Sequence, residues 1–265
     1  MLLDINGFSL YYETVGSGIP LLCLPAFPFD GRLWREQRSL GDIARLIIPD
    51  LRGVGRSSVT AGPYTMELMA EDMFSLLDHL RIDRAVVMGV SMGVYVAFAM
   101  YAANPRRFRG FIIADTRAEA DSPETVERRK RTVEGLLSQG TGILRDRVND
   151  LFAETTRRTR SELVEEMQVM VREMNPRGLA EQTLGMALRP DRTGLLPYIQ
   201  APALVLCGEE DTVSPCDGMR QMAARISGAR FHTIAHAGHL SPLEHPAAFN
   251  ALVREFLASL PAFEL

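Results

Sequence analysis

Short apolar runs alternate along the chain with longer segments in which apolar residues recur at helical spacing. Runs of about five residues rich in Val, Ile and Leu predict buried strands. Segment 66–80 instead places Met69, Met73, Leu76 and Leu80 on one face of a helix. This alternation is typical of an α/β protein with a mainly parallel twisted sheet and helices on both faces. The strands are expected at 20–24, 44–48, 84–88, 108–114, 202–208 and 229–234.

Three further segments complete the predicted core. Residues 2–15 alternate apolar and polar positions around Asn6-Gly7, which predicts a β-hairpin. Residues 50–57 contain two glycines, but no Gly-Lys-Ser or Gly-Lys-Thr follows, so we expect a structural turn and not a phosphate cradle. A short helix is expected at 33–40, and an amphipathic helix from about 246 to 260 ends the pattern.

The alternation stops between residues 116 and 201, where charged residues are frequent and every periodic segment is helical. We therefore predict a helical cap at 116–201, inserted into a core formed by 1–115 and 202–265. A stripe of apolar residues recurs at helical spacing at Leu163, Met167, Met170 and Met174. Two interpretations are open: the stripe packs into the core, or it forms a flexible apolar wall that contacts a substrate. The basic segments 128–131 and 157–158 indicate solvated faces or, alternatively, a docking patch for an acidic carrier or substrate. Cap helices are expected at 122–138, 141–153, 160–174 and 177–188.

Composition narrows the class of protein. Of 265 residues, 46% are hydrophobic, and no apolar run reaches the length of a membrane-spanning helix. The N-terminus lacks the basic and apolar regions of a signal peptide. The net charge of −4 argues against a nucleic-acid-binding surface. We expect a cytoplasmic protein without nucleic-acid or membrane partners, and its oligomeric state is unknown from sequence.

The three cysteines, Cys23, Cys207 and Cys216, have no Cys-x-x-Cys spacing, which predicts reduced, mostly buried thiols.

The segment 89–93, Gly-Val-Ser-Met-Gly, carries the strongest chemical signal. It fits the pattern G-x-S-x-G and lies between an apolar strand and an apolar helix, which is the context of a nucleophile elbow. Such a turn raises the hydroxyl of Ser91 above the sheet edge. The helix start places the backbone N–H of Met92 beside that hydroxyl, where an oxyanion would form.

A serine nucleophile needs a base, and the base needs an orienting acid. Asp211 and His239 each follow a predicted strand near the end of the chain, so both are expected at the carboxyl edge of the sheet with Ser91. His236 is the rival base and Asp115 the rival acid. The other acid candidates are Glu209, Glu210 and Asp217. No spacing of His, Cys and carboxylates resembles a metal site.

Together these segments resemble the α/β-hydrolase fold family, over essentially the whole chain outside the predicted cap. Within it the chain is most similar to the 3-oxoadipate enol-lactonase-like and carboxylesterase branch, which uses no cofactor. The resemblance implies a nucleophile at Ser91, an acid at Asp211 and a base at His239. It also implies oxyanion donors at the backbone N–H groups of Phe27 and Met92. The motifs that carry it are 24–28, 50–57, 89–93, 208–211 and 238–239.

One motif departs from the family pattern. The chain has Pro25-Ala26 where the family often has His-Gly, and this changes the loop that supplies an oxyanion donor. Because proline lacks an N–H, only Ala26 and Phe27 can donate between Pro25 and Pro28.

The function that follows is hydrolysis of a small or medium carboxylic ester or lactone through an acyl-enzyme. Carbon–carbon bond hydrolysis and cofactor-free perhydrolysis would use the same three residues. A slow-turnover receptor or scaffold on this fold is the alternative from another class of protein.

Overall fold

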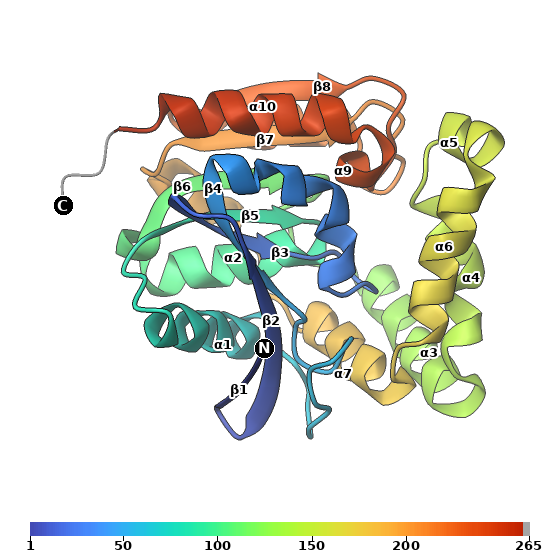
Figure 1. Cartoon of the computed structure of the whole chain (residues 1–265). Helices are drawn as coiled ribbons and strands as arrows, with labels where there is room; N and C mark the ends of the chain where they lie inside the picture. Colours follow the sequence, from blue (N-terminus) through green and yellow to red (C-terminus); the bar gives the residue numbers. More distant parts are fainter. Residues whose placement is uncertain (262–265) are drawn as a thin grey trace.

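Eight strands form one sheet in the order β1-β2-β4-β3-β5-β6-β7-β8 (Figure 1). The structure is a computed structural model that describes residues 1–261. The N-terminal hairpin pairs antiparallel through β2 with β4, and every later pairing is parallel. The predicted hairpin and parallel core are confirmed. The strands are β1 (Leu2–Ile5), β2 (Phe8–Val15), β3 (Ile19–Leu24), β4 (Ala44–Pro49), β5 (Ala85–Val90), β6 (Phe108–Ala114), β7 (Ala203–Gly208) and β8 (Arg230–Ile234).

Helices cover both faces of this sheet. Figure 1 shows α1 and α2 on one side and η1 and α10 on the other. Helix α2 is apolar almost all round because it lies between α1 and the strands β3 and β5. The 3-10 segment η1 stands where a short helix is predicted, and its backbone departs from helical geometry at Trp34. These helices are η1 (Gly31–Asp42), α1 (Met66–His79), α2 (Met92–Ala103), η2 (Pro105–Arg107), α8 (Cys216–Ala224), α9 (Ser241–Glu244) and α10 (Pro246–Ser259).

The central strand β5 aligns the carboxyl ends of its neighbours. All six of its residues are buried, as its continuous apolar run predicts. Gly89 of β5 is in register with Leu24 of β3, and Val90 with Ala114 of β6. The loops that leave these three strands therefore begin at one edge of the sheet.

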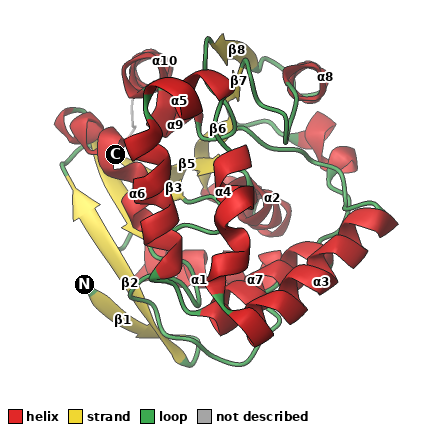
Figure 2. Cartoon of the chain, turned by 90° about the vertical axis from the view of Figure 1, so that its right-hand side faces the viewer, coloured by secondary structure: helices red, strands yellow, loops and turns green. Residues whose placement is uncertain are grey.

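A run of helices connects β6 to β7 and lies in front of that edge in Figure 2. The sequence predicts four helices here, whereas the structure contains an additional short helix, α5. Its N-cap, Ala153, has no side chain that can cap a helix, so the sequence holds no start signal there. The division into core 1–115 with 202–265 and cap 116–201 stays a prediction. The segments are α3 (Pro123–Gln139), η3 (Thr141–Leu144), α4 (Arg145–Asp150), α5 (Glu154–Thr159), α6 (Ser161–Arg172), α7 (Pro176–Ala187) and η4 (Thr193–Tyr198).

The methionine-containing stripe of α6, which continues to Met174 just past the end of the helix, is part of the hydrophobic core. Leu163, Met167, Met170 and Met174 are all buried, and they belong to the same packed cluster as the sheet residues. The core-packing interpretation of this stripe is therefore confirmed.

Residues 50–57 form a structural turn, as predicted. The carboxylate of Asp50 accepts hydrogen bonds from the backbone N–H groups of Gly31 and Arg56, at 2.9 and 2.8 Å. Arg52 forms a buried ion pair with Asp72 of α1 at 2.7 Å. The side chains of Asp50 and Arg52 therefore hold the turn in place. Within residues 1–261, no helix has both the length and the hydropathy needed to cross a membrane.

Candidate active site

Ser91 stands at a sharp turn between β5 and α2. Its backbone has φ 52° and ψ −115°, outside the regions that most residues adopt. A Cβ at Gly89 would lie 2.8 Å from the backbone of Gly93, and a Cβ at Gly93 would lie 2.2 Å from the carbonyl oxygen of Leu24. Only glycine fits at both positions. This is the strand–turn–helix geometry of a nucleophile elbow.

Three side chains from separate loops form a hydrogen-bonded row. His239 Nε2 lies 2.8 Å from Ser91 Oγ, and His239 Nδ1 lies 2.8 Å from Asp211 Oδ2. Ser91 follows β5, Asp211 follows β7 and His239 follows β8, so all three stand at the carboxyl edge. His239 and Asp211 are only 3% and 5% exposed. The structure thus brings together the three residues that the sequence analysis selects.

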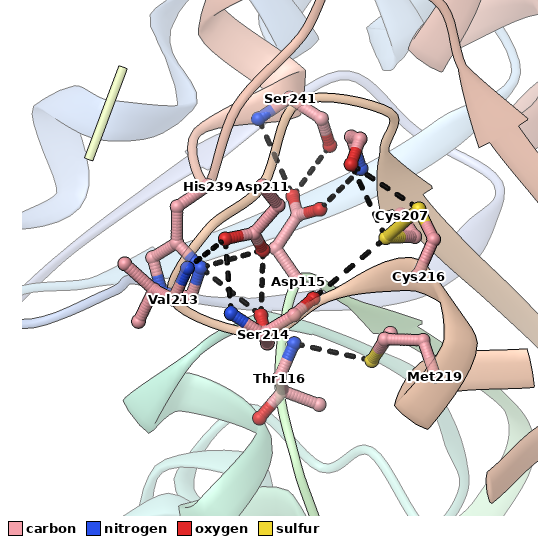
Figure 3. The surroundings of a disulfide bond; sticks show 11 residues. Asp115, Thr116, Cys207, Asp211, Val213, Ser214, Cys216, Met219, His239 and Ser241 are labelled. Atoms are coloured by element: carbon pink, nitrogen blue, oxygen red, sulfur yellow. Dashed lines mark hydrogen bonds and ion pairs between the residues drawn. A yellow bond between two sulfur atoms is a disulfide. The ribbon is translucent and has the colours of Figure 1, made fainter. Parts of the chain in front are cut away.

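Asp211 is held as a carboxylate by several donors. Its Oδ1 accepts the backbone N–H groups of Val213 and Ser214, at 2.8 and 3.0 Å, and its Oδ2 accepts the hydroxyl of Ser214 at 2.6 Å (Figure 3). Burial acts to raise its pKa, but His239 and these hydrogen bonds outweigh burial, so the pKa of Asp211 is lowered. An ionised Asp211 can fix the ring of His239 with Nε2 toward Ser91.

Asp115, the rival acid, is buried beside Asp211 but bonds to other groups (Figure 3). Its carboxyl group accepts the N–H of Gly208 at 2.8 Å and the hydroxyl of Ser241 at 2.5 Å. Burial, followed by the charge of Asp211, raises the pKa of Asp115 well above its usual range. Asp115 therefore packs behind the row, and the carboxylate that hydrogen-bonds to His239 is that of Asp211.

The rival base, His236, lies at the surface. Its side chain is 68% exposed, and its Nδ1 is 3.8 Å from Glu210. Glu209 and Asp217 are also exposed. Within residues 1–261, His239 is the histidine that hydrogen-bonds to Ser91. The same residues contain no group of three or more His, Cys, Asp or Glu side chains arranged to hold a metal.

The two predicted oxyanion donors are the backbone N–H groups of Met92 and Phe27. Met92 is the first residue of α2, where backbone N–H groups have no partner inside the helix. Phe27 follows β3 and lines the same pocket as Ser91. Within the described part of the chain, the N–H of Phe27 forms no hydrogen bond. Both groups are thus free to donate to a ligand, and their role stays a prediction.

Ser91 and His239 open into a pocket of about 500 Å³, its mouth included. Phe27, Leu151 and Met186 supply apolar walls. Val213 is apolar as well, and the rest of the lining is polar or charged, with four arginines from the loop after β6 and from α3 and α4. The sequence predicts a solvated face for the basic residues of α3, with a docking patch for an acidic carrier or substrate as the alternative. The structure places Arg128 and Arg129 in the pocket wall, because one side of α3 faces Ser91.

Glu244 is a buried residue of the site that the sequence analysis missed. Its carboxylate accepts the N–H groups of Gly238 at 2.8 Å and Ala153 at 2.9 Å. The backbone N–H of His239 donates to the carbonyl of Leu151 at 2.8 Å. The histidine loop is therefore bound to the segment that leads into α5. No local sequence motif indicates this role, because Glu244 and its partner Ala153 lie far apart in the sequence.

The prediction of three reduced cysteines is wrong for two of them. Cys207, at the end of β7, and Cys216, at the start of α8, form a disulfide with Cα atoms 5.7 Å apart (Figure 3). The loop between them turns back on itself around Asp211, and this brings the two thiols together without a recognisable spacing. Cys23 is a free, buried thiol whose pKa is raised by burial. A cytoplasmic location stays a prediction, and disulfides are rare in that compartment.

The chain belongs to the α/β hydrolase fold family, whose pattern matches residues 19–246. It is 41% identical to a thermophilic esterase from Thermogutta terrifontis, described with malate bound, over 97% of this chain and 96% of that one, with a TM-score of 0.94. It is 29% identical to 3-oxoadipate enol-lactonase 2 from Acinetobacter baylyi, over 95% and 94% of the two chains. It is 27% identical to a 2-hydroxymuconate semialdehyde hydrolase from Pseudomonas sp. (strain CF600), over 93% and 89%. The chain is thus an enzyme of the branch that contains esterases and enol-lactonases, and the predicted family is confirmed.

Proposed function

We propose that this enzyme cleaves small or medium carboxylic esters or lactones through an acyl-enzyme. The observation that carries the proposal is the hydrogen-bonded row of Ser91, His239 and Asp211, with the serine hydroxyl open to the pocket. A buried base that contacts a strained serine is the arrangement that activates a hydroxyl as nucleophile. The similarity to an esterase and to an enol-lactonase supports the same bond class.

The reaction follows from the positions of these groups. His239 Nε2 takes the proton of Ser91 as its Oγ attacks the acyl carbon, and Asp211 stabilises the imidazolium that forms. The N–H groups of Phe27 and Met92 donate to the resulting oxyanion. The intermediate then expels the alkoxy group, which receives the proton from His239. Water, deprotonated by His239, attacks the acyl-enzyme and releases the carboxylic acid and Ser91.

A covalent probe tests the nucleophile directly. A fluorophosphonate should label Ser91 alone, and Ser91→Ala should abolish labelling while lowering kcat on p-nitrophenyl acetate at least about 10³-fold. Ser138→Ala, which changes an exposed serine of α3, serves as the control and should keep both. Labelling that persists in Ser91→Ala protein would show that the nucleophile is another residue. Labelling of Ser91 without measurable ester turnover would instead favour the alternative function, a receptor on this fold that turns over its ligand slowly.

Carbon–carbon bond hydrolysis is the second candidate, because a 2-hydroxymuconate semialdehyde hydrolase is among the relatives. Perhydrolysis is the third and would use hydrogen peroxide in place of water at the acyl-enzyme. Parallel assays on an ester, a lactone, a vinylogous 1,5-diketone and an ester with peroxide rank these activities. A higher kcat/KM on the diketone than on every ester and lactone would reject the ester assignment.

A further inference from the structure

A disulfide closes the loop that carries Asp211 (Figure 3). It joins Cys207, near the end of β7, to Cys216, the first residue of α8. The closed segment runs from residue 208 to residue 215 and contains Asp211. The proposed reaction uses the carboxylate of Asp211 but no sulfur atom, so the chemistry of ester cleavage does not account for a covalent bond at this place.

Ser214 connects the disulfide to the hydrogen-bonded row. It is only 4% exposed, and its hydroxyl donates to Asp211 Oδ2 at 2.6 Å and lies 3.1 Å from His239 Nδ1. Its backbone N–H donates to Asp211 Oδ1 at 3.0 Å. On the other side, its carbonyl oxygen lies 3.8 Å from Cys207 Sγ, and Cys216 follows it by two residues. A movement of Cys216 would therefore reach the groups that orient His239.

The two sulfur atoms differ in their freedom to move. Cys207 is fully buried in β7, a strand that is paired on both sides, with β6 and β8. Cys216 is partly exposed, and Pro215 and Asp217 beside it are exposed. When a disulfide becomes two thiols, the sulfur atoms separate from bonding distance to van der Waals contact, by about 1.5 Å. Because the sheet holds Cys207, we expect this movement at Cys216 and in the residues before it.

We propose, on the basis of the proposed hydrolase function, that the Cys207–Cys216 pair is a redox switch for the activity of Ser91. The disulfide form holds Ser214 and Asp211 in place and is the active form. In the dithiol form Ser214 moves outward with Cys216, and Asp211 orients the base less well. Since a misplacement of about 1 Å can cost a catalytic site about 10²-fold, we expect kcat to fall at least about tenfold, with a smaller change in KM.

A small dithiol is the reductant that operates the switch. Its thiolate attacks Cys216 Sγ, the accessible sulfur, and the S–S bond breaks so that Cys207 leaves as a thiolate and takes up a proton. The second thiol of the reagent then attacks the mixed disulfide, which releases Cys216 as a thiol and the reagent as a cyclic disulfide. Two electrons and two protons pass to the protein, and oxidised glutathione reverses the exchange. Such reversible disulfides are the kind found in cytosolic proteins.

Reversible reduction of the wild-type protein tests the switch. The protein is incubated with dithiothreitol, freed of reagent by anaerobic gel filtration and assayed on p-nitrophenyl acetate. It is assayed again after reoxidation with oxidised glutathione. Alkylation and mass spectrometry determine the state of the pair, and thermal unfolding checks that the reduced chain is folded at the assay temperature. We expect kcat to fall on reduction and to recover on reoxidation. A folded chain whose disulfide resists dithiothreitol, or a reduced chain that keeps its kcat, would overturn the proposal.

Two cysteine variants locate the effect. Cys216→Ser removes the bond at its partly exposed end, so it should show the low kcat of the reduced enzyme and no response to dithiothreitol. Cys23→Ala is the matched control, because Cys23 is a free, buried thiol of β3. It should keep the response of the wild-type chain. A Cys216→Ser variant with the kcat of the oxidised enzyme contradicts the proposal, and so does a loss of the response in Cys23→Ala.

A spectroscopic measurement separates the switch from the proposed catalysis. The proton between His239 Nδ1 and Asp211 Oδ2 lies in a charge-assisted hydrogen bond, so its proton NMR signal is expected at low field and requires no turnover. The signal should shift or broaden on reduction and return on reoxidation. This change without any ester hydrolysis would support the switch and reject the proposed function. Ester hydrolysis with the same signal and the same kcat in both redox forms would support the proposed function and reject the switch.

Discussion

Asp211 and Asp115 are neighbouring buried carboxyl groups with opposite electrostatic surroundings. His239 and the donors around Ser214 lower the pKa of Asp211, whereas burial and the nearby charge of Asp211 raise that of Asp115. Two carboxyl groups this close do not both ionise easily, so the one with more donors keeps the negative charge. The hydrogen bonds therefore favour Asp211 as the group that orients His239, although both residues follow a strand at the same edge.

Exchanging each carboxyl group for an amide separates the two roles. Asp211→Asn presents an amide to His239 Nδ1, favours the wrong ring tautomer and should lower kcat by about 10⁴. Asp115→Asn removes no partner of His239 and should lower kcat less than about tenfold. Steady-state kinetics on p-nitrophenyl acetate, with thermal unfolding as the control for folding, measure both. A larger loss in Asp115→Asn than in Asp211→Asn would exchange the two assignments.

The elements differ in how far the sequence could predict them. The turn at Ser91 is local: strand, glycines and helix lie within about twenty residues, so the pattern carries the geometry. The arginines of α3 and the bridge from Glu244 to Ala153 depend on how distant helices pack, which no local periodicity encodes. The disulfide between Cys207 and Cys216 could not be predicted from sequence for the same reason. The conformation of the loop between the two cysteines, and not a sequence motif, brings them together.

Glu244 is expected to act as a positioning residue for the histidine loop. Glu244→Gln turns one acceptor oxygen into an NH2 group that faces a backbone N–H, at a cost of about 1–3 kcal/mol. The melting temperature should fall by several degrees. Because Gly238 precedes His239, kcat should also fall about tenfold, with KM changed less than about twofold.

The kinetic measurement is made well below the melting temperature, so that partial unfolding does not contribute. Glu255→Gln on the exposed face of α10 is the control and should change neither quantity. An unaltered kcat together with a lowered melting temperature would assign Glu244 a purely structural role.

At the scale of the whole molecule, the fold buries several carboxyl groups whose pKa is raised. Burial is the first cause that raises the pKa of Asp115, Asp50 and Glu244. Each of these groups binds its proton more tightly in the folded chain than in the unfolded chain. Asp211 behaves in the opposite way, since its lowered pKa favours the ionised folded state. The pH dependence of stability therefore has two opposed parts.

The free energy of unfolding is expected to be higher at pH 5 than at pH 7. A carboxyl group with a raised folded pKa contributes stability at low pH, and this contribution is lost as pH rises through that pKa. The slope is at most about 1.4 kcal/mol per pH unit for each such group. Below about pH 4 the sign reverses, because protonation of Asp211 breaks its pairing with His239. Urea unfolding at pH 3.5, 5 and 7 measures this maximum.

Asp115→Asn removes one of the titrating groups and should reduce the difference between pH 5 and pH 7. Asp217→Asn, on the exposed start of α8, is the matched control and should leave that difference unchanged. Stability that increases steadily from pH 5 to pH 7 in the wild-type chain would mean that Asp115, Asp50 and Glu244 are accommodated as carboxylates. In that event the negative charge of the site would be spread over Asp115 and Asp211. The assignment of one ionised carboxylate beside His239 would then have to be revised.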